Sequence, residues 1–323
     1  MKLIYAIAAA LSLLLAQHAS AQAVWPQQPV RILVGFTAGT APDIVARVLA
    51  EKLAASWGRP VLVENVGGAG GNIACSRVAH SPPDGHALVM CGNGSLVLAP
   101  SLYTKLPYDP VKDFVPITQV FVAANILVVH PDVPVNSIPE LVALAKAQPG
   151  NLTYAHTGTG TSQHLAGELF KHMAQVDIRP VAYRGTTAVL PDLLAGRLSM
   201  SFSNISNVLP LVREGKLKGF AVSSARRSGA APDLPTMNEM GYPGFEAVPW
   251  FGLMAPAGTP ATVTDKIYAE TIKVLALPEV RKQFAVLGID VIGGTPAEFA
   301  AVITTETVQW AKLIKAMGIG VIE

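Results

Sequence analysis

The sequence predicts an α/β protein with two lobes, and two features support this prediction. Short apolar strands alternate with amphipathic helices, which is typical of mainly parallel sheets covered by helices. Two extended segments, at about 120–129 and 247–255, could carry the chain between lobes. A chain of 323 residues is long enough for two cores. We therefore expect one lobe from residues 22–124 and 248–323, and another from residues 125–247.

The N-terminal segment has the three parts of a cleavable signal peptide. Lys2 supplies a positive start, residues 3–15 form an apolar run, and Ala19-Ser20-Ala21 has the small-x-small form of a signal-peptidase site. The run is short for a membrane span, and no later stretch is long enough. We expect residues 1–21 to be removed and the mature protein to be periplasmic.

The strand–helix units of the first lobe follow in order. The pattern predicts strands at 29–36, 61–63 and 87–90, a helix that Asp43 opens, and a second helical segment after Gly67–Gly71. Near the C-terminus, Thr295-Pro296-Ala297-Glu298 combines Thr at the N-cap, Pro at N1 and Glu at N3. A long helix is expected to begin there.

The middle of the chain repeats this pattern for the second lobe. Ser137-Ile138-Pro139-Glu140 is a capping box for a helix that ends at Pro149-Gly150. Strands are predicted at 152–155, 181–183, 198–202 and 219–223, with helices carrying the apolar residues Leu165, Leu169, Phe170, Met173, Val189, Leu190, Leu193 and Leu194.

The two cysteines, Cys75 and Cys91, would enter an oxidising compartment. The first should lie on a helix and the second at the end of the next strand, so they could pair. Both could equally be small buried hydrophobes. Spacing alone cannot supply the geometry of a disulfide, and we therefore favour two unpaired thiols.

The charge balance argues against two classes of partner. Cleavage removes Lys2 and leaves 23 basic against 22 acidic residues. With only 14% charged residues, a nucleic acid or an acidic membrane surface is not expected as a partner. No Cys/His spacing resembles a zinc site, so we expect neither metal nor cofactor.

Three loops have a similar composition and the same position in front of a helix. Each is rich in Gly and small polar residues and precedes a helix: 37–41, 67–72 and 157–162. Small side chains let backbone amides point outward at a helix N-terminus, where partial positive charge and unpaired donors suit an anion. One such loop could be a simple turn. Three loops at equivalent strand ends indicate a binding cleft between the lobes.

The same loops lack the sequence motifs of common catalytic sites. Gly68-Ala69-Gly70-Gly71-Asn72-Ile73 fails the dinucleotide fingerprint, since Ile73 stands at its sixth position. Neither a phosphate-binding GKS or GKT sequence nor a G-x-S-x-G elbow occurs. We therefore expect no enzyme activity.

The loops also carry a family resemblance over nearly the whole mature chain. The chain resembles the Bug-type receptors of the tripartite tricarboxylate transporter family, which are periplasmic binding proteins with a Venus-flytrap fold. The resembling segments are Val34–Arg47, Glu64–Gly71, Pro83-Asp84-Gly85, Tyr154–Leu165, Tyr183-Arg184-Gly185, Gly215-Lys216-Leu217, Leu234-Pro235-Thr236, Glu239-Met240-Gly241 and Ala255–Pro260.

The resemblance implies capture of a small acid and its delivery to a membrane permease. Such an acid would be a di- or tricarboxylate, an aromatic acid or, less favoured, an amino acid, and the receptor would act as a monomer. The residues proposed to bind it are Phe36, Gly39, Thr40, Ala41, Asp43, Gly68, Ala69, Gly70, Gly71, Thr157, Gly158, Gly160, Thr161, Ser162, His164, Tyr183, Gly185, Ser203 and Asn204.

The chain departs from the family pattern at Ala38, Thr40, Ser199 and Ser203. The family commonly has Pro-Gly-Gly where this chain has Ala38-Gly39-Thr40, so Thr40 should project at the cleft. Asp is usual where Ser199 and Ser203 stand. A ligand ammonium group would lose a counter-charge if either position faces the cleft, and we therefore favour a carboxylic acid over an amino acid.

Two other functions are compatible with a two-lobed α/β fold. An orphan sensor that signals to a membrane partner would share the fold and the cleft. A periplasmic hydrolase or transferase is less favoured, because no nucleophile–base pair stands at recognisable spacing.

Overall fold

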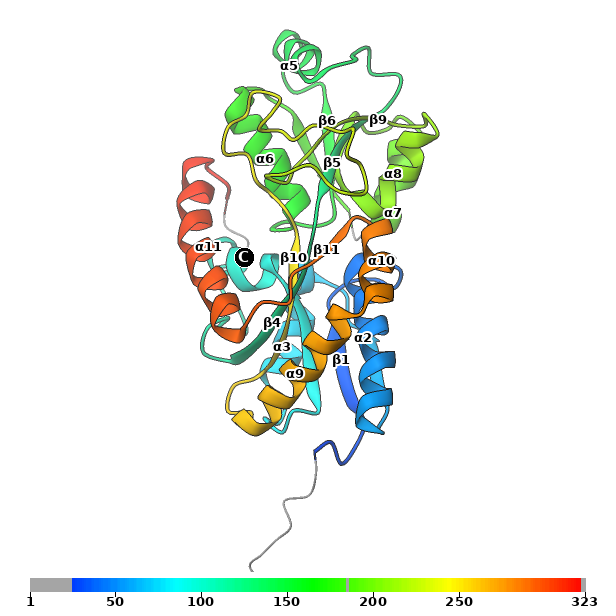
Figure 1. Cartoon of the computed structure of the whole chain (residues 1–323). Helices are drawn as coiled ribbons and strands as arrows, with labels where there is room; N and C mark the ends of the chain where they lie inside the picture. Colours follow the sequence, from blue (N-terminus) through cyan, green and yellow to red (C-terminus); the bar gives the residue numbers. More distant parts are fainter. Residues whose placement is uncertain (1–24, 184–185, 321–323) are drawn as a thin grey trace, which may run out of the picture.

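The computed structural model describes residues 25–183 and 186–320, which form two sheets with helices on their faces (Figure 1). The first sheet has six strands in the order β11-β4-β10-β3-β1-β2. Their bounds are β1 Val30–Val34, β2 Val61–Asn65, β3 Ala87–Gly92, β4 Phe114–Ala123, β10 Trp250–Pro256 and β11 Ile289–Val291. This lobe therefore takes strands from both ends of the chain.

The second sheet has five strands in the order β7-β6-β8-β5-β9, all from the middle of the chain. Their bounds are β5 Asn125–Val129, β6 Thr153–His156, β7 Arg179–Ala182, β8 Met200–Asn204 and β9 Lys218–Val222. Most strands begin and end within a few residues of the sequence prediction.

The strand directions explain why the carboxyl ends of both sheets face each other. In the first sheet β1 pairs in parallel with β2 and β3, and in the second β6 pairs in parallel with β7 and β8. Two antiparallel strands enter from the other lobe: β10 is antiparallel to β3 and β4, and β5 is antiparallel to β8 and β9. An entering strand starts at the cleft and runs away from it, and the short edge strand β11, which is antiparallel to β4, adds a further reversal, so both sheets are mixed.

Helices cover both faces of each sheet. Around the first sheet lie α2 Ala41–Trp57, η1 Ala69–Gly71, α3 Asn72–Ala79, the π-helical turn η2 Gly94–Leu98, α4 Ala99–Leu102, α9 Ala261–Ala276, α10 Pro278–Val286 and α11 Pro296–Ala316. Around the second lie α5 Ile138–Ala147, α6 Ser162–Ala174, α7 Thr186–Leu194 and α8 Ile205–Arg213. Among the described residues, no helix has the length and apolarity that crossing a bilayer requires.

Local capping signals mark helix starts as predicted, with one exception. Thr295 and Glu298 form the capping box of α11, and the Ser137 hydroxyl accepts the Glu140 amide at the start of α5. Helix α2 begins at Ala41 rather than at Asp43, because Pro42 fits the first turn and Asp43 takes the third position.

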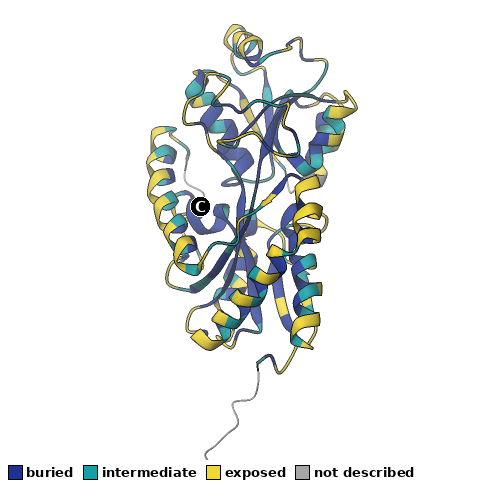
Figure 2. Ribbon diagram, viewed as in Figure 1, coloured by how far each residue is buried: buried dark blue, intermediate teal, exposed yellow. Residues whose placement is uncertain are grey.

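Burial follows the two-sheet plan (Figure 2). The central strands β3, β5 and β10 are wholly buried, whereas the edge strands β2 and β7 contain no buried residue and the outer faces of α9, α10 and α11 are exposed. One apolar cluster runs through both lobes and includes Val89 and Met254 beside Leu127 and Phe202. The lobes therefore share a continuous core along one side.

The two crossings lie side by side and are hydrogen-bonded to each other. The first is Ala124, between β4 and β5, and the second leads into β10 (Figure 1). The Ala123 amide donates to Pro249, and the Asn125 side chain donates to Ala247 at 3.4 Å. These bonds join the crossings into one hinge region.

The expectation of two unpaired thiols is wrong. Cys75 on α3 and Cys91 on β3 form a disulfide, with a Cα–Cα distance of 6.4 Å. The α3 helix packs directly on β3, which brings together two residues that are 16 apart in sequence. A closed loop of this length contributes about 3 kcal/mol of stability by restricting the unfolded chain.

Candidate ligand-binding cleft

Two adjoining cavities lie between the lobes. The inner cavity has a volume of about 60 Å³ and the outer one about 670 Å³. Phe36, Thr40, Gly70 and Thr157 line both, so the two form one cleft. The inner cavity is further lined by Ala41, Pro42, Gly92, Asn93, Gly94, Thr161, Ser162, Gln163, Asn204, Asn207, Pro249 and Phe251. The outer one is further lined by Gly35, Thr37, Gly67, Gly68, Ala69, Tyr103, Gly158, Thr159 and Tyr183.

The two lobes touch at Gly94 and Gly160. A Cβ atom on Gly94 would lie 3.0 Å from the carbonyl oxygen of Gly160, and 3.6 Å from that of Gly70. The first distance is tighter than ordinary van der Waals contact, so these backbones approach each other with no side chain between them. A larger residue at position 94 would push the lobes apart.

The start of helix α2 presents one uncapped amide donor, that of Ala41, to the inner cavity, since Pro42 has no N–H group. Its first residues Ala41 and Pro42 line the cavity together with the N-cap residue Thr40. No side chain caps the helix, because the Thr40 hydroxyl donates to the carbonyl oxygen of Thr37 at 2.7 Å. The first amides of an uncapped helix have no partner inside it, and the helix dipole adds partial positive charge. This end of α2 therefore favours an anion.

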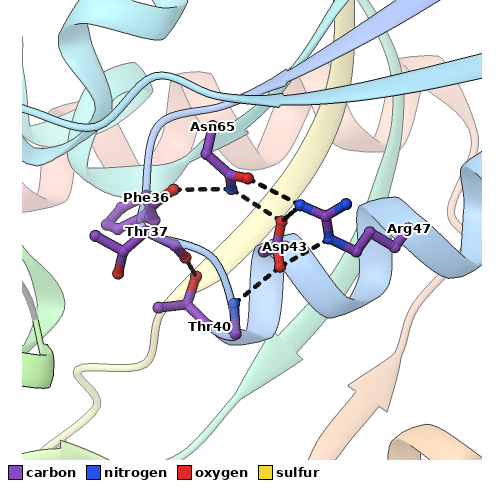
Figure 3. A network of polar contacts seen from close by, with 7 residues as sticks. Phe36, Thr37, Thr40, Asp43, Arg47 and Asn65 are labelled. Atoms are coloured by element: carbon purple, nitrogen blue, oxygen red, sulfur yellow. Dashed lines mark hydrogen bonds and ion pairs between the residues drawn. The ribbon is translucent and has the colours of Figure 1, made fainter.

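A charged network behind α2 holds its loop (Figure 3). The Asp43 carboxylate accepts the Gly39 amide at 2.9 Å and pairs with Arg47, also at 2.9 Å. The Asn65 side chain donates to Asp43 and to the carbonyl oxygen of Phe36. Burial acts to raise the pKa of Asp43, but hydrogen bonds from Arg47, Gly39 and Asn65 outweigh it and lower that pKa below its usual value. Asp43 is thus a charged support behind the loop.

The loop before α6 satisfies several of its amides internally. Thr157 donates both its amide and its hydroxyl to the Gln163 side chain, and the Thr161 amide donates to Gly158. The expectation that the amides of this loop point outward therefore fails for much of the loop. The donors that α6 offers to the inner cavity are the amides of its first turn, at Ser162 and Gln163.

Two buried histidines lie behind this loop. His156 ends β6 and is 3% exposed, while His164 lies in the first turn of α6 and is 6% exposed. The Gly158 amide donates to Nδ1 of His156 at 3.3 Å, and the Gly160 amide donates to Nδ1 of His164 at 3.4 Å. Burial lowers the pKa of both imidazoles, to about 4 for His164, where the nearby His156 adds to the effect. Both rings are therefore neutral at pH 7.

A third helix start, that of α8, also reaches the inner cavity. Asn204 caps this helix by accepting the Ser206 amide at 3.1 Å, and Asn207 follows in its first turn. Both asparagines line the cavity. Side-chain amides thus add to the backbone donors of α2 and α6.

Aromatic residues provide the apolar part of the cleft. The rings of Phe36 and Phe251 meet edge to face with their centroids 5.4 Å apart, at the inner cavity. Tyr103 and Tyr183 line the outer cavity, and the Tyr183 hydroxyl donates to Asp192 at 2.6 Å. These rings offer apolar surface to the body of a ligand.

The cleft is polar without being charged. None of the described residues that line either cavity is an Asp, Glu, Lys or Arg. Over residues 25–183 and 186–320, no group of three or more His, Cys, Asp or Glu side chains could hold a metal ion. Recognition of an anion would therefore depend on amides and hydroxyls.

Most residues proposed from the sequence line the cleft: Phe36, Thr40, Ala41, Gly68, Ala69, Gly70, Thr157, Gly158, Thr161, Ser162, Tyr183 and Asn204. Six others do not: Gly39, Asp43, Gly71, Gly160, His164 and Ser203. Gly39, Asp43, Gly160 and His164 support the loops from behind. The backbones of Gly71 and Gly35 pack closely, since a Cβ atom on Gly35 would lie 2.5 Å from the Cα atom of Gly71. Gly185 lies outside the described residues.

Two groups stand out among the lining residues that were not predicted. Gly92 ends β3, Asn93 and Gly94 follow it, and a Gly/Asn run at the end of a strand is the same signal that marked the other loops. Pro249 and Phe251 carry no local signal, because only the second crossing brings them to the cleft.

The two serines that replace the family's usual Asp do not line the cleft. Ser199 lies near the opposite end of β8, where its hydroxyl accepts the Thr153 amide at 3.1 Å. Ser203 is buried and donates to the hydroxyl of Ser201 at 3.0 Å. A carboxylate at either position would not line the cleft, so these serines do not distinguish a carboxylic acid from an amino acid. The preference for a carboxylic acid depends instead on the absence of Asp and Glu among the described lining residues.

Comparison with known proteins places the chain in a family. The profile of the tripartite tricarboxylate transporter family receptor matches residues 45–319. The protein BugT of Bordetella pertussis is 34% identical over 295 residues, which cover 91% of this chain and 90% of that protein.

Two solved structures from Rhodopseudomonas palustris are similar to the chain in both sequence and fold. Rpa4515 with adipate has a TM-score of 0.88 and 32% identity, covering 92% of this chain and 100% of the other. MatC with bound malate has a TM-score of 0.83 and 32% identity, covering 90% and 100%. Together with the profile match, these similarities confirm the resemblance seen in the sequence. The chain belongs to the receptors of the tripartite tricarboxylate transporter family.

Proposed function

We propose that this protein is a periplasmic receptor that captures a small carboxylate-bearing solute between its two lobes. The observation that carries the proposal is the inner cavity, lined by the first turns of both α2 and α6. These helices pack on different sheets, and each offers partial positive charge there, α2 with the Ala41 amide and α6 with the Ser162 and Gln163 amides. A carboxylate bound at this point is attracted by both lobes at once, which favours the closed arrangement.

The two cavities suit different parts of one organic acid. A volume of about 60 Å³ holds little more than a carboxylate group, whereas about 670 Å³ holds the remainder of a small molecule. The relatives solved with adipate and with malate support an organic acid as the ligand class. An amino acid is less favoured, because no described lining residue offers a carboxylate to its ammonium group.

The wider biological role follows from the family and the N-terminal pattern. Residues 1–21 would direct export and be removed, and the mature monomer would deliver its solute to a membrane permease. The lobes would comprise residues 22–124 with 248–323, and residues 125–247. Membership of a receptor family gives no support to a hydrolase or transferase.

The proposal is tested by screening organic acids against the purified mature protein. Thermal shift with adipate, malate and benzoate should reveal at least one stabilising acid, after native mass spectrometry has checked for a co-purified ligand. At a hundredfold excess over Kd, a bound acid stabilises the fold by about 2.7 kcal/mol.

A charge placed in the inner cavity should abolish this stabilisation. Gln163→Glu keeps the side-chain size and the oxygen that accepts from Thr157, but adds a negative charge beside the ligand carboxylate. The exposed Gln283 supplies the matched control Gln283→Glu. Undiminished binding in Gln163→Glu would contradict a carboxylate at this point.

A further inference from the structure

We infer that His156 and His164 act as positioning residues that hold the 157–162 loop in its binding conformation as neutral imidazoles, and that protonation of the pair releases this loop. Neither ring lines the cleft. Their effect on binding would therefore be exerted through Gly158 and Gly160, to which they are hydrogen-bonded.

The direction of these two hydrogen bonds fixes the protonation state of the rings. A backbone amide can only donate, so Nδ1 of each imidazole must be the unprotonated acceptor and Nε2 carries the proton. Protonation would place an N–H group on Nδ1 opposite another N–H group. Each hydrogen bond would then become a repulsive contact, and both glycine amides would lose their acceptor.

The surroundings oppose a positive charge on the pair. The ring centroids lie 4.5 Å apart, so a cation on one ring disfavours a cation on the other. The Glu168 carboxylate on α6 acts to raise the pKa of both rings, but it also accepts from Tyr154 at 2.6 Å and pairs with Lys171 at 2.9 Å. Burial outweighs Glu168 and lowers the pKa of both rings.

The neighbouring elements supply no free counter-charge. Strands β5 and β8 contain no ionisable residue. On β7, Arg179 lies at the far end and pairs in register with Thr153, whereas His156 is opposite Ala182. On α7, Asp192 is engaged by Tyr183 and Arg197. A protonated pair would therefore remain buried, with the Glu168 carboxylate compensating its charge only in part.

The supported loop belongs to the cleft. Gly158 lines the outer cavity, and Gly160 forms the point where the second lobe touches Gly94 of the first. Both glycines have positive φ, +137° and +79°, a backbone conformation that glycine adopts without steric strain. Release of the loop would disturb both the lining and the contact between lobes. We therefore expect the protein to bind its solute more weakly in acid, an expectation that rests on the function proposed above.

The inference can be tested on the full mature chain without a ligand. Nitrogen NMR at pH 7.5 should show both rings with the proton on Nε2. On titration to pH 4.0, the protection factors of the Gly158 and Gly160 amides, which correct for the slower intrinsic exchange in acid, should fall at least tenfold, following the titration of the two rings. A proton on Nδ1 at pH 7.5, or unchanged protection factors at pH 4.0, would overturn the inference.

Substitution of the two histidines separates the effect of their protonation from the effect of their packing. Asn places a side-chain oxygen close to the position of Nδ1, so His156→Asn and His164→Asn should keep both hydrogen bonds and lose the acid response. The exposed His172 gives the control His172→Asn, which should titrate as wild type. A wild-type acid response retained in the doubly substituted protein would count against the histidine pair.

A binding measurement separates this inference from the proposed function. Adipate affinity should fall at least tenfold more between pH 7.5 and 4.5 in the wild type than in the doubly substituted protein. The comparison cancels protonation of adipate itself, since carboxylic acids titrate near this pH. If the amides respond to acid but no acid of the screen binds, the proposed function fails and the loop support stands. If adipate binds with the same pH dependence in both proteins, loop support does not govern binding.

Discussion

The two loops that face each other across the cleft perform the same task with opposite chemistry. In the first lobe, the loop before α2 is held by the ionised network of Asp43 and Arg47. In the second lobe, the loop before α6 is held by the neutral rings of His156 and His164. In each case a side chain behind the loop accepts a glycine amide, at Gly39 or at Gly158 and Gly160.

The difference shows that the protein keeps charge out of its cleft in two ways. A carboxylate can accept an amide near the site only if a cation balances it, and Arg47 does this from behind. An imidazole accepts the same bond without charge, but only while it stays unprotonated. The first support should therefore withstand mild acid, whereas the second should not.

The largest expected effect is a loss of stability in acid that originates in the second lobe. His164 in the unfolded chain takes up a proton below about pH 6.5, but in the folded protein its pKa is lowered to about 4. The unfolded state thus binds more protons in this window, so stability is complete above pH 6.5 and falls as the pH drops towards 4. The shift corresponds to about 3 kcal/mol at 1.36 kcal/mol per unit. Urea unfolding of wild type and His164→Asn at pH 7.0 and 4.5 measures it, and equal losses in both would contradict the prediction.

Removal of the Asp43 carboxylate should lower the free energy of unfolding by less than acid does through His164, and this loss should be independent of pH over the physiological range. Asp43→Ala deprives the Gly39 amide and the Asn65 side chain of their acceptor, at a cost of about 2 kcal/mol. Because the pKa of Asp43 is lowered, its contribution is present above the unfolded value near 3.9 and is lost only in stronger acid. Urea unfolding at pH 6 and 8 should show the same loss. Asp132→Ala, at an exposed carboxylate, is the control.

The smallest effect concerns the contact between the two loops. Gly94→Ala places a methyl group 3.0 Å from the Gly160 carbonyl oxygen, so closure should become less favourable. We expect adipate binding to weaken about tenfold, or 1.4 kcal/mol, with the unfolding midpoint of the empty protein unchanged. Gly229→Ala is the matched control, since nothing lies within 4 Å of an added Cβ there. Equal affinities in the two variants would show that binding does not need this contact.

The sequence allowed much of the fold and of the cleft to be predicted. Capping boxes at Ser137 and Thr295 located helix starts because they are local hydrogen-bond patterns. The three loops were found because Gly, Ser and Thr after a strand are visible in a few residues. The role of Asp43 could not be read in this way, since it depends on Asn65 from the next strand.

The long-range features were decided by tertiary structure alone. The disulfide between Cys75 and Cys91 formed because α3 packs on β3, and Phe251 reached the cleft because β10 enters from the other lobe. The neutral state of His156 and His164 likewise follows from their burial behind the loop. The sequence by itself determined the strand–helix order, the position of the glycine-rich loops before helix starts and the family, because each depends on neighbouring residues or on motif order. Pairings, burial and the direction of each hydrogen bond required the packing of distant segments.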